Sequence, residues 1–205
     1  MYENLEVIQL KYFLLGVMIG VLIFYFFSFQ LFICDVVYYF MSKVYSIKTI
    51  QKIPITLETA WDFFSKPDNL KEITPDNLGF NIISKHHGTT MYAGQIIEYK
   101  VSPILGIPLY WMTEITHVEN KKYFVDEQRY GPYSMWHHQH HFKAIEGGVE
   151  MTDIVHYKLP LFFLGDIANV ILVKSQLRGI FNYRYKAVDD KFGKWQGAEN
   201  KVVFG

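Results

Sequence analysis

The chain has 205 residues, half of them hydrophobic and 18% aromatic, which is enough apolar material for one ordinary domain with a large core. Lysine plus arginine equals aspartate plus glutamate, at 20 each, so no net charge attracts nucleic acid and no nucleic-acid partner is expected. The single cysteine, Cys34, excludes an internal disulfide. The composition therefore excludes a disordered chain and a disulfide-stabilised scaffold.

No charged residue occurs between positions 12 and 34. A helix over this stretch would be about 34 Å long, slightly more than the hydrocarbon core of a bilayer. A secretory signal is disfavoured because Glu3 and Glu6 stand where a basic region is expected, and no small-residue cleavage site follows. We therefore predict that an N-terminal segment, residues 1–40, contains a transmembrane helix at about 12–34.

The lysines near this segment favour one orientation in a membrane. Lys43, Lys48 and Lys52 follow it, whereas only Lys11 precedes it, so the domain after it is expected on the cytoplasmic side of a single-pass membrane protein. The alternative is that translation starts at Met41. Residues 1–40 would then be a mistranslated leader, and the protein would be soluble in the cytoplasm.

The chain after position 41 predicts one domain, residues 41–195, followed by a tail at 196–205. Residues 44–53 have the composition of a strand, and Thr56 is a plausible N-cap for a short helix that ends before Pro67. A helical turn is expected at 70–73. Turn-forming residues then separate six segments of strand character: 80–84, 94–101, 109–118, 123–130, 135–145 and 149–159.

The longest helical signal closes the domain, from Asp166 as N-cap to Gly193 as C-cap. Apolar residues recur in it every three or four positions and form one stripe: Val170, Val173, Leu177, Phe181, Tyr185, Val188 and Phe192. A helix with such a stripe and a curved antiparallel sheet with one apolar face can bury each other. The expected fold class is α+β.

A hairpin with histidines on its inner face is the most informative part of the sequence. If Gly147 and Gly148 form a two-residue turn, pairing is fixed along both strands. It places Phe142 opposite Asp153, His140 opposite Val155, His138 opposite Tyr157 and Trp136 opposite Leu159. The other face, with residues such as His137 and Lys143, is more polar, so the first face points inward. On the strand 123–130, Asp126 and Gln128 are expected to face inward because Glu127 and Arg129 are better solvated.

These residues and this layout resemble a known superfamily. The matching positions are Ile53, Pro54, Glu58, Trp61, Phe124, Val125, Asp126, Gln128, Gly131, Pro132, Tyr133, Trp136, His138, His140, Phe142, Asp153, Val155 and Tyr157. From about Val44 to Gly193 the chain is similar to the START-like or SRPBCC superfamily, and within it to bacterial proteins labelled cell-division-inhibitor-like. The resemblance implies a helix-grip (Bet v 1/START-like) fold and a cavity that holds hydrophobic or amphipathic small molecules. It implies no activity.

The function predicted from this pattern is binding of a lipid or other small hydrophobic or amphipathic ligand in an internal cavity, by a domain that a membrane helix tethers. A few polar groups in an apolar lining are typical of such cavities. The expected ligand-binding residues are Trp111, Asp126, Gln128, Trp136, His138, His140, Phe142, Asp153, Tyr157, Leu177 and Phe181.

Two alternatives use the same polar side chains. The first is an acid–base enzyme of the cyclase or dehydratase type, with His138, His140 and Asp153 moving protons. The second is a purely structural network in which histidine, aspartate and tyrosine seal the core. A zinc site with Asp153 as third ligand is disfavoured because the sequence places no glutamate or further histidine inside, so no metal or cofactor is expected.

Overall fold

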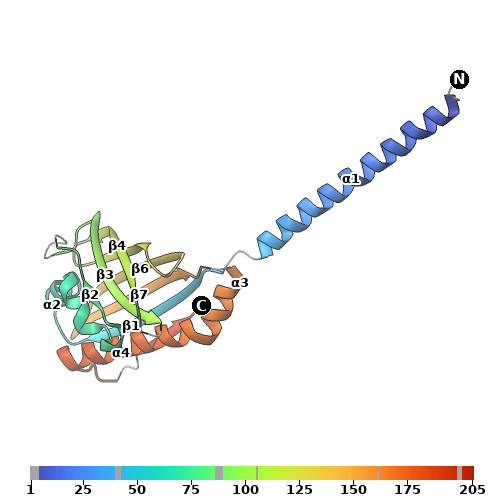
Figure 1. The fold of residues 1–205 in the computed structure, drawn as a ribbon. Coiled ribbons are helices and arrows are strands. Elements are labelled where there is room, and N and C mark those ends of the chain that lie inside the picture. The colour runs from blue at the N-terminus through green and yellow to red at the C-terminus, as the bar shows by residue number, and fades with distance from the viewer. Residues whose placement is uncertain (1–4, 40–42, 86–89, 105, 161, 198–199) are drawn as a thin grey trace. The chain divides into compact units, whose positions relative to one another are not determined.

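A computed structural model describes residues 5–39, 43–85, 90–104, 106–160, 162–197 and 200–205 (Figure 1). The chain divides into two compact units, Met1–Met41 and Ser42–Gly205, and each unit is described here by itself. The alternative start at Met41 lies outside the described residues.

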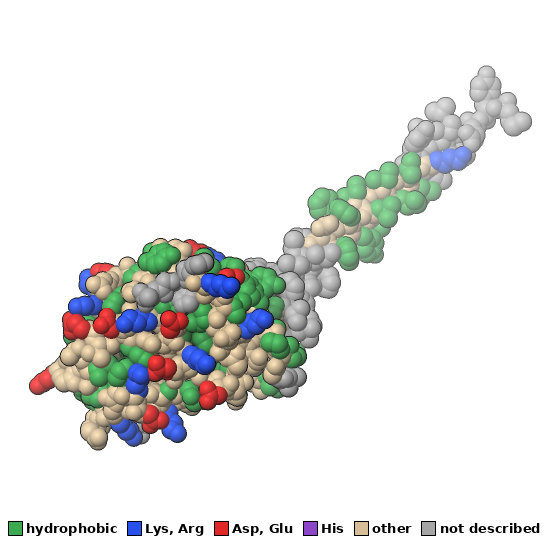
Figure 2. Space-filling model, turned by 60° about the vertical axis from the view of Figure 1, so that its left-hand side comes forward, with side chains coloured by type: hydrophobic (Ala, Val, Ile, Leu, Met, Phe, Trp, Pro, Cys, Tyr) green, Lys and Arg blue, Asp and Glu red, His purple; other side chains and the backbone are tan. Residues whose placement is uncertain are grey.

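The first unit contains the helix α1 (Leu5–Tyr39), which confirms the helix predicted there. Among the described residues, its segment Phe13–Gln30 is the one helical stretch long and apolar enough to cross a membrane. On the visible face, hydrophobic side chains cover most of the segment Phe13–Gln30, whereas acidic and basic side chains are interspersed over the second unit (Figure 2). A helix that is apolar all round has to be covered by something other than water.

The second unit is a curved sheet with a long helix packed on it. Its elements in chain order are β1 (Tyr45–Ile53), α2 (Leu57–Phe64), the 3-10 helices η1 (Pro67–Ile73) and η2 (Asp76–Leu78), β2 (Asn81–Ile82), β3 (Gln95–Ile104), β4 (Ile107–Glu119), β5 (Tyr123–Tyr130), β6 (Met135–Ile145), β7 (Gly148–Lys158), α3 (Phe162–Ala168), the π-helix η3 (Asn169–Val173), α4 (Lys174–Phe192) and β8 (Lys201–Phe204). In the described residues the strands form one antiparallel sheet in the order β2-β3-β4-β5-β6-β7-β1-β8. The sheet curves over α4 (Figure 1), which confirms the α+β helix-grip fold.

Local sequence signals fix several of these boundaries. The Thr56 side chain accepts a hydrogen bond from the Thr59 amide at 3.1 Å, as expected of the N-cap of α2. At the other end of the domain, α4 stops at Gly193, whose φ of +95° favours glycine. In the core between the sheet and α4, Ile47 and Val155 of the sheet pack against Leu177 and Phe181 of the helix. The apolar stripe of the helix therefore covers the inner face of the sheet.

The start of the last helix differs from the prediction in two ways. Asp166 lies inside α3 and accepts a hydrogen bond from the Tyr45 hydroxyl at 3.0 Å, so it is not the N-cap. Val170 is 76% exposed instead of belonging to the buried stripe. The reason is the π-helix η3, in which each turn holds an extra residue, so that Asn169 takes the buried position.

The C-terminal tail predicted at 196–205 contains a strand. β8 pairs with β1, with Thr49 opposite Val202. The segment is only four residues long and carries no turn signal that would have separated it from a tail. It covers the edge of β1, and edge strands that stay open invite unwanted pairing.

The hairpin of β6 and β7 forms, but its register is shifted by two residues from the prediction. The two-residue loop is Glu146 and Gly147, with φ +80° at Gly147, and Ile145 pairs with Gly148. Gly148 is needed for another reason, since a Cβ there would lie 2.2 Å from the Ile53 carbonyl oxygen.

The observed pairs are Phe142 with Met151, His140 with Asp153, His138 with Val155 and Trp136 with Tyr157. Leu159 therefore does not stand opposite Trp136. Because a shift of two residues preserves the side to which each side chain points, the predicted inner face is unchanged.

Candidate functional site

An internal cavity of about 200 Å³ lies between the sheet and α4. Most of its wall is apolar. β3 and β4 contribute Ile97 and Ile115, and α4 contributes Ile180 and Phe181. Polar residues on the wall come from η1 and the residues beside it, from β3 to β6 and from α4, and Asp126, His138, His140 and Arg184 among them form one cluster.

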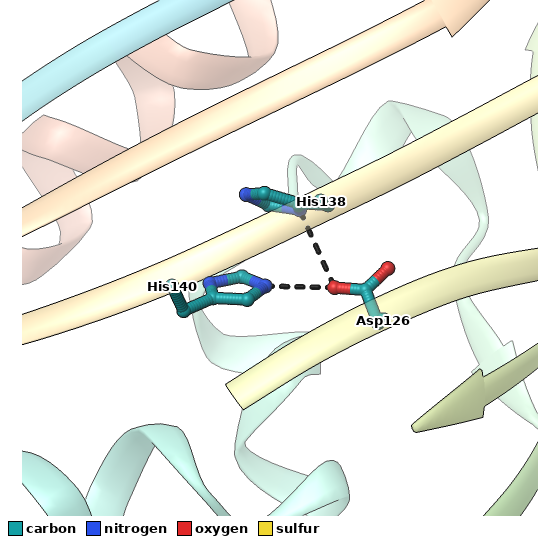
Figure 3. A group of neighbouring side chains, drawn as sticks. All are labelled: Asp126, His138 and His140. Atoms are coloured by element: carbon teal, nitrogen blue, oxygen red, sulfur yellow. Dashed lines mark hydrogen bonds and ion pairs between the residues drawn. The ribbon is translucent and has the colours of Figure 1, made fainter. Parts of the chain in front are cut away.

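This polar cluster begins with three side chains from two neighbouring strands. His138 and His140 alternate on β6 and so point to the same face, and Asp126 of β5 pairs directly with His138 (Figure 3). Asp126 Oδ2 lies 2.7 Å from His140 Nε2 and 3.4 Å from His138 Nδ1. The two imidazole rings are 3.7 Å apart between centroids. All three side chains line the cavity.

A second carboxylate lies behind the imidazoles. Asp153 Oδ1 lies 3.2 Å from His138 Nε2 and 2.9 Å from His140 Nδ1, while its other oxygen accepts a hydrogen bond from the Thr49 hydroxyl at 3.2 Å. The guanidinium of Arg184, which α4 extends toward the sheet, is 3.6 Å from Asp153 Oδ1. The cluster thus contains two carboxylates, two imidazoles and one guanidinium, all nearly buried.

One atom of the cluster has no hydrogen-bond partner. Among the described buried side-chain nitrogens and oxygens, His140 Nδ1 alone lacks one. The oxygen of Asp153 is near enough at 2.9 Å, but it lies off the direction in which a ring N–H points. The contact between these two groups is therefore electrostatic.

The two histidines differ in their affinity for a proton. Burial lowers the pKa of both, but the hydrogen bond to Asp126 and the carboxylate of Asp153 raise the pKa of His140 above its ordinary value. Burial and the nearby charge of His140 keep the pKa of His138 below its ordinary value despite the same carboxylates. Of the two imidazoles, His140 is therefore the one that binds a proton more tightly.

Both carboxylates are ionised. Burial favours the protonated form of Asp126, but the neighbouring imidazoles and Arg184 outweigh it and lower its pKa. The same competition, with Arg184 as the largest opposing effect, holds the pKa of Asp153 well below its usual range. The cluster therefore sets two ionised carboxylates against the Arg184 guanidinium and the more basic imidazole, His140, with the carboxylate of Asp126 at the cavity wall.

A second polar group faces the cavity from β3 and β4. The Tyr99 hydroxyl and the Trp111 indole N–H both reach the hydroxyl of Thr113, the latter at 3.0 Å. Burial and the charge of Asp126 raise the pKa of Tyr99, so its phenol stays protonated. These three groups hydrogen-bond with one another, whereas Asp126 and the imidazoles present a separate polar region of the wall.

The structure places seven of the eleven sequence-predicted site residues on the cavity wall. They are Trp111, Asp126, Trp136, His138, His140, Leu177 and Phe181. The other four lie around it.

Those four have partners elsewhere. Gln128 bonds the main chain of Tyr133 and holds the turn between β5 and β6. Phe142 packs in the aromatic core with Trp61, and the Tyr157 hydroxyl donates to Asn169 at 2.8 Å. Asp153 belongs to the cluster but stands behind the histidines rather than on the lining.

Arg184 is the member of the ionisable cluster that the sequence reasoning missed, and Tyr99 and Thr113 are further polar lining residues that it did not predict. Arg184 lines the cavity, contacts Asp153 and lies over the ring of Phe64 at 5.6 Å. The helical spacing of the sequence could have identified Arg184, because position 184 continues the series 177, 181, 188 on the buried side of α4. An arginine on an apolar stripe indicates a buried acidic partner.

Solved structures with the same architecture are found in bacteria and plants. Protein CV1439 from Chromobacterium violaceum superimposes with a TM-score of 0.56 at 10% identity, covering 73% of this chain and 98% of that one. Ginseng major latex-like protein 151 from Panax ginseng gives 0.55 at 13% identity, covering 73% and 99%. TTHA0849 from Thermus thermophilus gives 0.54 at 13% identity, covering 72% and 96%.

The domain has the START-like (SRPBCC) helix-grip fold. At these identities the likeness establishes the fold alone, so the function has to be argued from the cavity. No protein-family model matches the sequence, and no curated protein matches it.

Replacing Arg184 tests the charge balance of the cluster. Arg184→Met keeps the unbranched aliphatic part of the side chain but leaves Asp153 buried without its cation, so we expect the free energy of unfolding to fall by about 3 kcal/mol. Lys186→Met, an exposed position on the same helix, is the control and should change it by less than about 0.5 kcal/mol. All four tryptophans lie in the domain, so denaturation followed by tryptophan fluorescence reports on it. Equal effects of the two substitutions would contradict the assigned role of Arg184.

Proposed function

We propose that the domain binds a compact amphipathic molecule in the cavity between the sheet and α4. The observation that carries the proposal is the cavity itself, a mostly apolar chamber with the ionised carboxylate of Asp126, two imidazoles and the Arg184 guanidinium on its wall. A mostly apolar lining with a few convergent polar groups is the usual construction of a small-molecule site. The apolar wall supplies affinity, and the polar cluster supplies orientation.

The size of the cavity favours a small guest. Ligand pockets usually have volumes of about 300–1,000 Å³, and an engineered cavity of about 150 Å³ holds benzene. A cavity of about 200 Å³ therefore suits a molecule of one or two rings, or a short chain. An intact membrane lipid would require the walls to move apart.

The polar cluster favours a guest with a hydrogen-bond donor. Asp126 is ionised and accepts hydrogen bonds, and its side chain is 16% exposed, more than any other member of its group. Burying a donor without an acceptor costs free energy, so a hydroxyl or amino group on the guest would be oriented toward Asp126. His138, which is neutral, offers a further contact.

A titration with 2-naphthol tests this proposal, because the compound has two fused rings and one hydroxyl. We expect calorimetry to show one site in the full-length protein in detergent. Ile97→Trp should weaken binding at least about tenfold, because Ile97 is 4% exposed and lines the cavity, which the larger ring would fill.

Ile96→Trp is the matched control. Ile96 precedes Ile97 on β3, points to the opposite face and is 41% exposed, so binding should be unchanged. Equal affinity in the wild type and Ile97→Trp would show that 2-naphthol binds elsewhere, and the proposal would fail for guests of this kind. Mass spectrometry of small molecules that copurify with the protein would then identify the natural guest class.

We further propose that α1 tethers the domain to the cytoplasmic face of a membrane. The apolar segment Phe13–Gln30 supports this, as does the excess of lysine after it. A tether would keep a domain for apolar guests close to the phase in which such compounds concentrate.

Cell fractionation tests the tether. The chain expressed from Met1 should stay in the membrane pellet after alkaline carbonate extraction, and the same chain started at Met41 should be soluble. Protease added to sealed spheroplasts should leave the domain intact, because it faces the cytoplasm. A full-length chain in the soluble fraction, or one shortened by cleavage after α1, would contradict the proposal.

A further inference from the structure

We propose that Asp126, His138 and His140 form a site for one divalent transition-metal ion of the zinc type. The site would use Asp126 Oδ2, His138 Nδ1 and His140 Nε2 as ligand atoms. Two imidazoles and one carboxylate are a donor set that suits such ions. Binding of a guest in the cavity does not require the metal, so this proposal goes beyond the proposed function.

The distances between the ligand atoms fit a metal ion. The three atoms all lie within 4.8 Å of one another, and Asp126 Oδ2 is 2.7 Å from one ligand nitrogen and 3.4 Å from the other. Zinc lies about 2.1 Å from nitrogen and oxygen ligands, so neighbouring ligand atoms of a tetrahedral site are about 3.4 Å apart. The side chains need only small movements to admit the ion.

The sheet itself holds these ligands in place. His138 and His140 are two residues apart on β6 and therefore share one face, and Asp126 is the residue of β5 that pairs with His138. Figure 3 shows both imidazoles and the carboxylate converging from these two strands. A site built on paired strands is more rigid than one built on loops.

The nitrogens that do not face Asp126 meet a second carboxylate. Asp153 Oδ1 lies 3.2 Å from His138 Nε2 and 2.9 Å from His140 Nδ1. Metal-binding histidines usually place their second nitrogen against a carboxylate or carbonyl, which sets the orientation of the ring. Asp153 is in turn held by Thr49 and Arg184. The sequence indicated Asp153 as a possible third ligand, whereas the geometry assigns that position to Asp126 and places Asp153 behind the rings.

The remaining side of the site is open to the cavity. Asp126, His138 and His140 all line it, so three protein ligands would leave a fourth position for water or for a polar group of a guest. Asp126 would bring one negative charge to the ion, and a second carboxylate, Asp153, lies behind the imidazoles in contact with Arg184.

Calorimetric titration of the full-length, tag-free protein with ZnCl₂, after treatment with a chelator, tests the site. We expect one equivalent of zinc to bind the wild type. Asp153→Asn should weaken binding by about 10–100-fold, because it removes the group that orients the rings. Asp126→Asn, which removes a ligand, should weaken it more than Asp153→Asn does. His117→Gln, at an exposed position of β4, is the control and should bind like the wild type.

Two results would overturn the proposal: no stoichiometric zinc binding by the wild type, or unchanged affinity in Asp126→Asn. Circular dichroism of each variant shows whether it has folded. If Asp126→Asn does not fold, His140→Gln replaces it in the same test, with the same expected loss. Titration of the chelator-treated wild type with 2-naphthol separates the zinc site from the proposed guest binding. If this protein binds 2-naphthol but not zinc, only the metal site is contradicted.

Discussion

Two carboxylates on the inner face of a sheet can stay ionised only if positive charge lies beside them. Asp126 and Asp153 meet this requirement through Arg184 on α4 and through His140, whose raised pKa favours its positively charged form. Because Arg184 comes from the helix and the acids from the sheet, the charge balance links the two layers that the apolar stripe also joins. Removal of one partner leaves a charge that neither water nor the core can stabilise.

The same interaction gives the cavity its chemistry. An apolar chamber alone would select guests by shape, whereas Asp126 and the imidazoles add one point at which a hydrogen-bond donor or a metal ion is favoured. Asp153 and Arg184 fix the orientation of these groups without occupying the chamber. The polar end of the site is therefore preorganised, so a guest or ion would pay little free energy for ordering it.

The sequence predicted the architecture because its signals are local. Alternation along β6 and β7 identified the inner face, and the solvation of Glu127 and Arg129 identified Asp126 as inward-facing. What it could not predict depends on contacts distant in the chain. Gly148 lies in β7 instead of the turn, β1 approaches it too closely for a Cβ, and the register differs by two residues from the one that a Gly147–Gly148 turn implies. Arg184 was missed because its acidic partner comes from another element.

Two further differences have the same origin. The π-helix η3 exposes Val170 and buries Asn169, which the Tyr157 hydroxyl then satisfies. β8 is too short to have its own signal and forms because the edge of β1 is available. Tertiary packing decided both outcomes, and it acts on segments for which local preference is weak.

The unequal protonation of the two buried imidazoles is the central claim, and nuclear magnetic resonance can measure it directly. With ¹⁵N-labelled histidine, the ring nitrogens of His140 should report a pKa above 6.5 and those of His138 a pKa below it, with resonances assigned by His138→Gln and His140→Gln. Both rings titrating together at the ordinary value for a solvent-exposed histidine would contradict the buried, charge-balanced cluster and the site built on it.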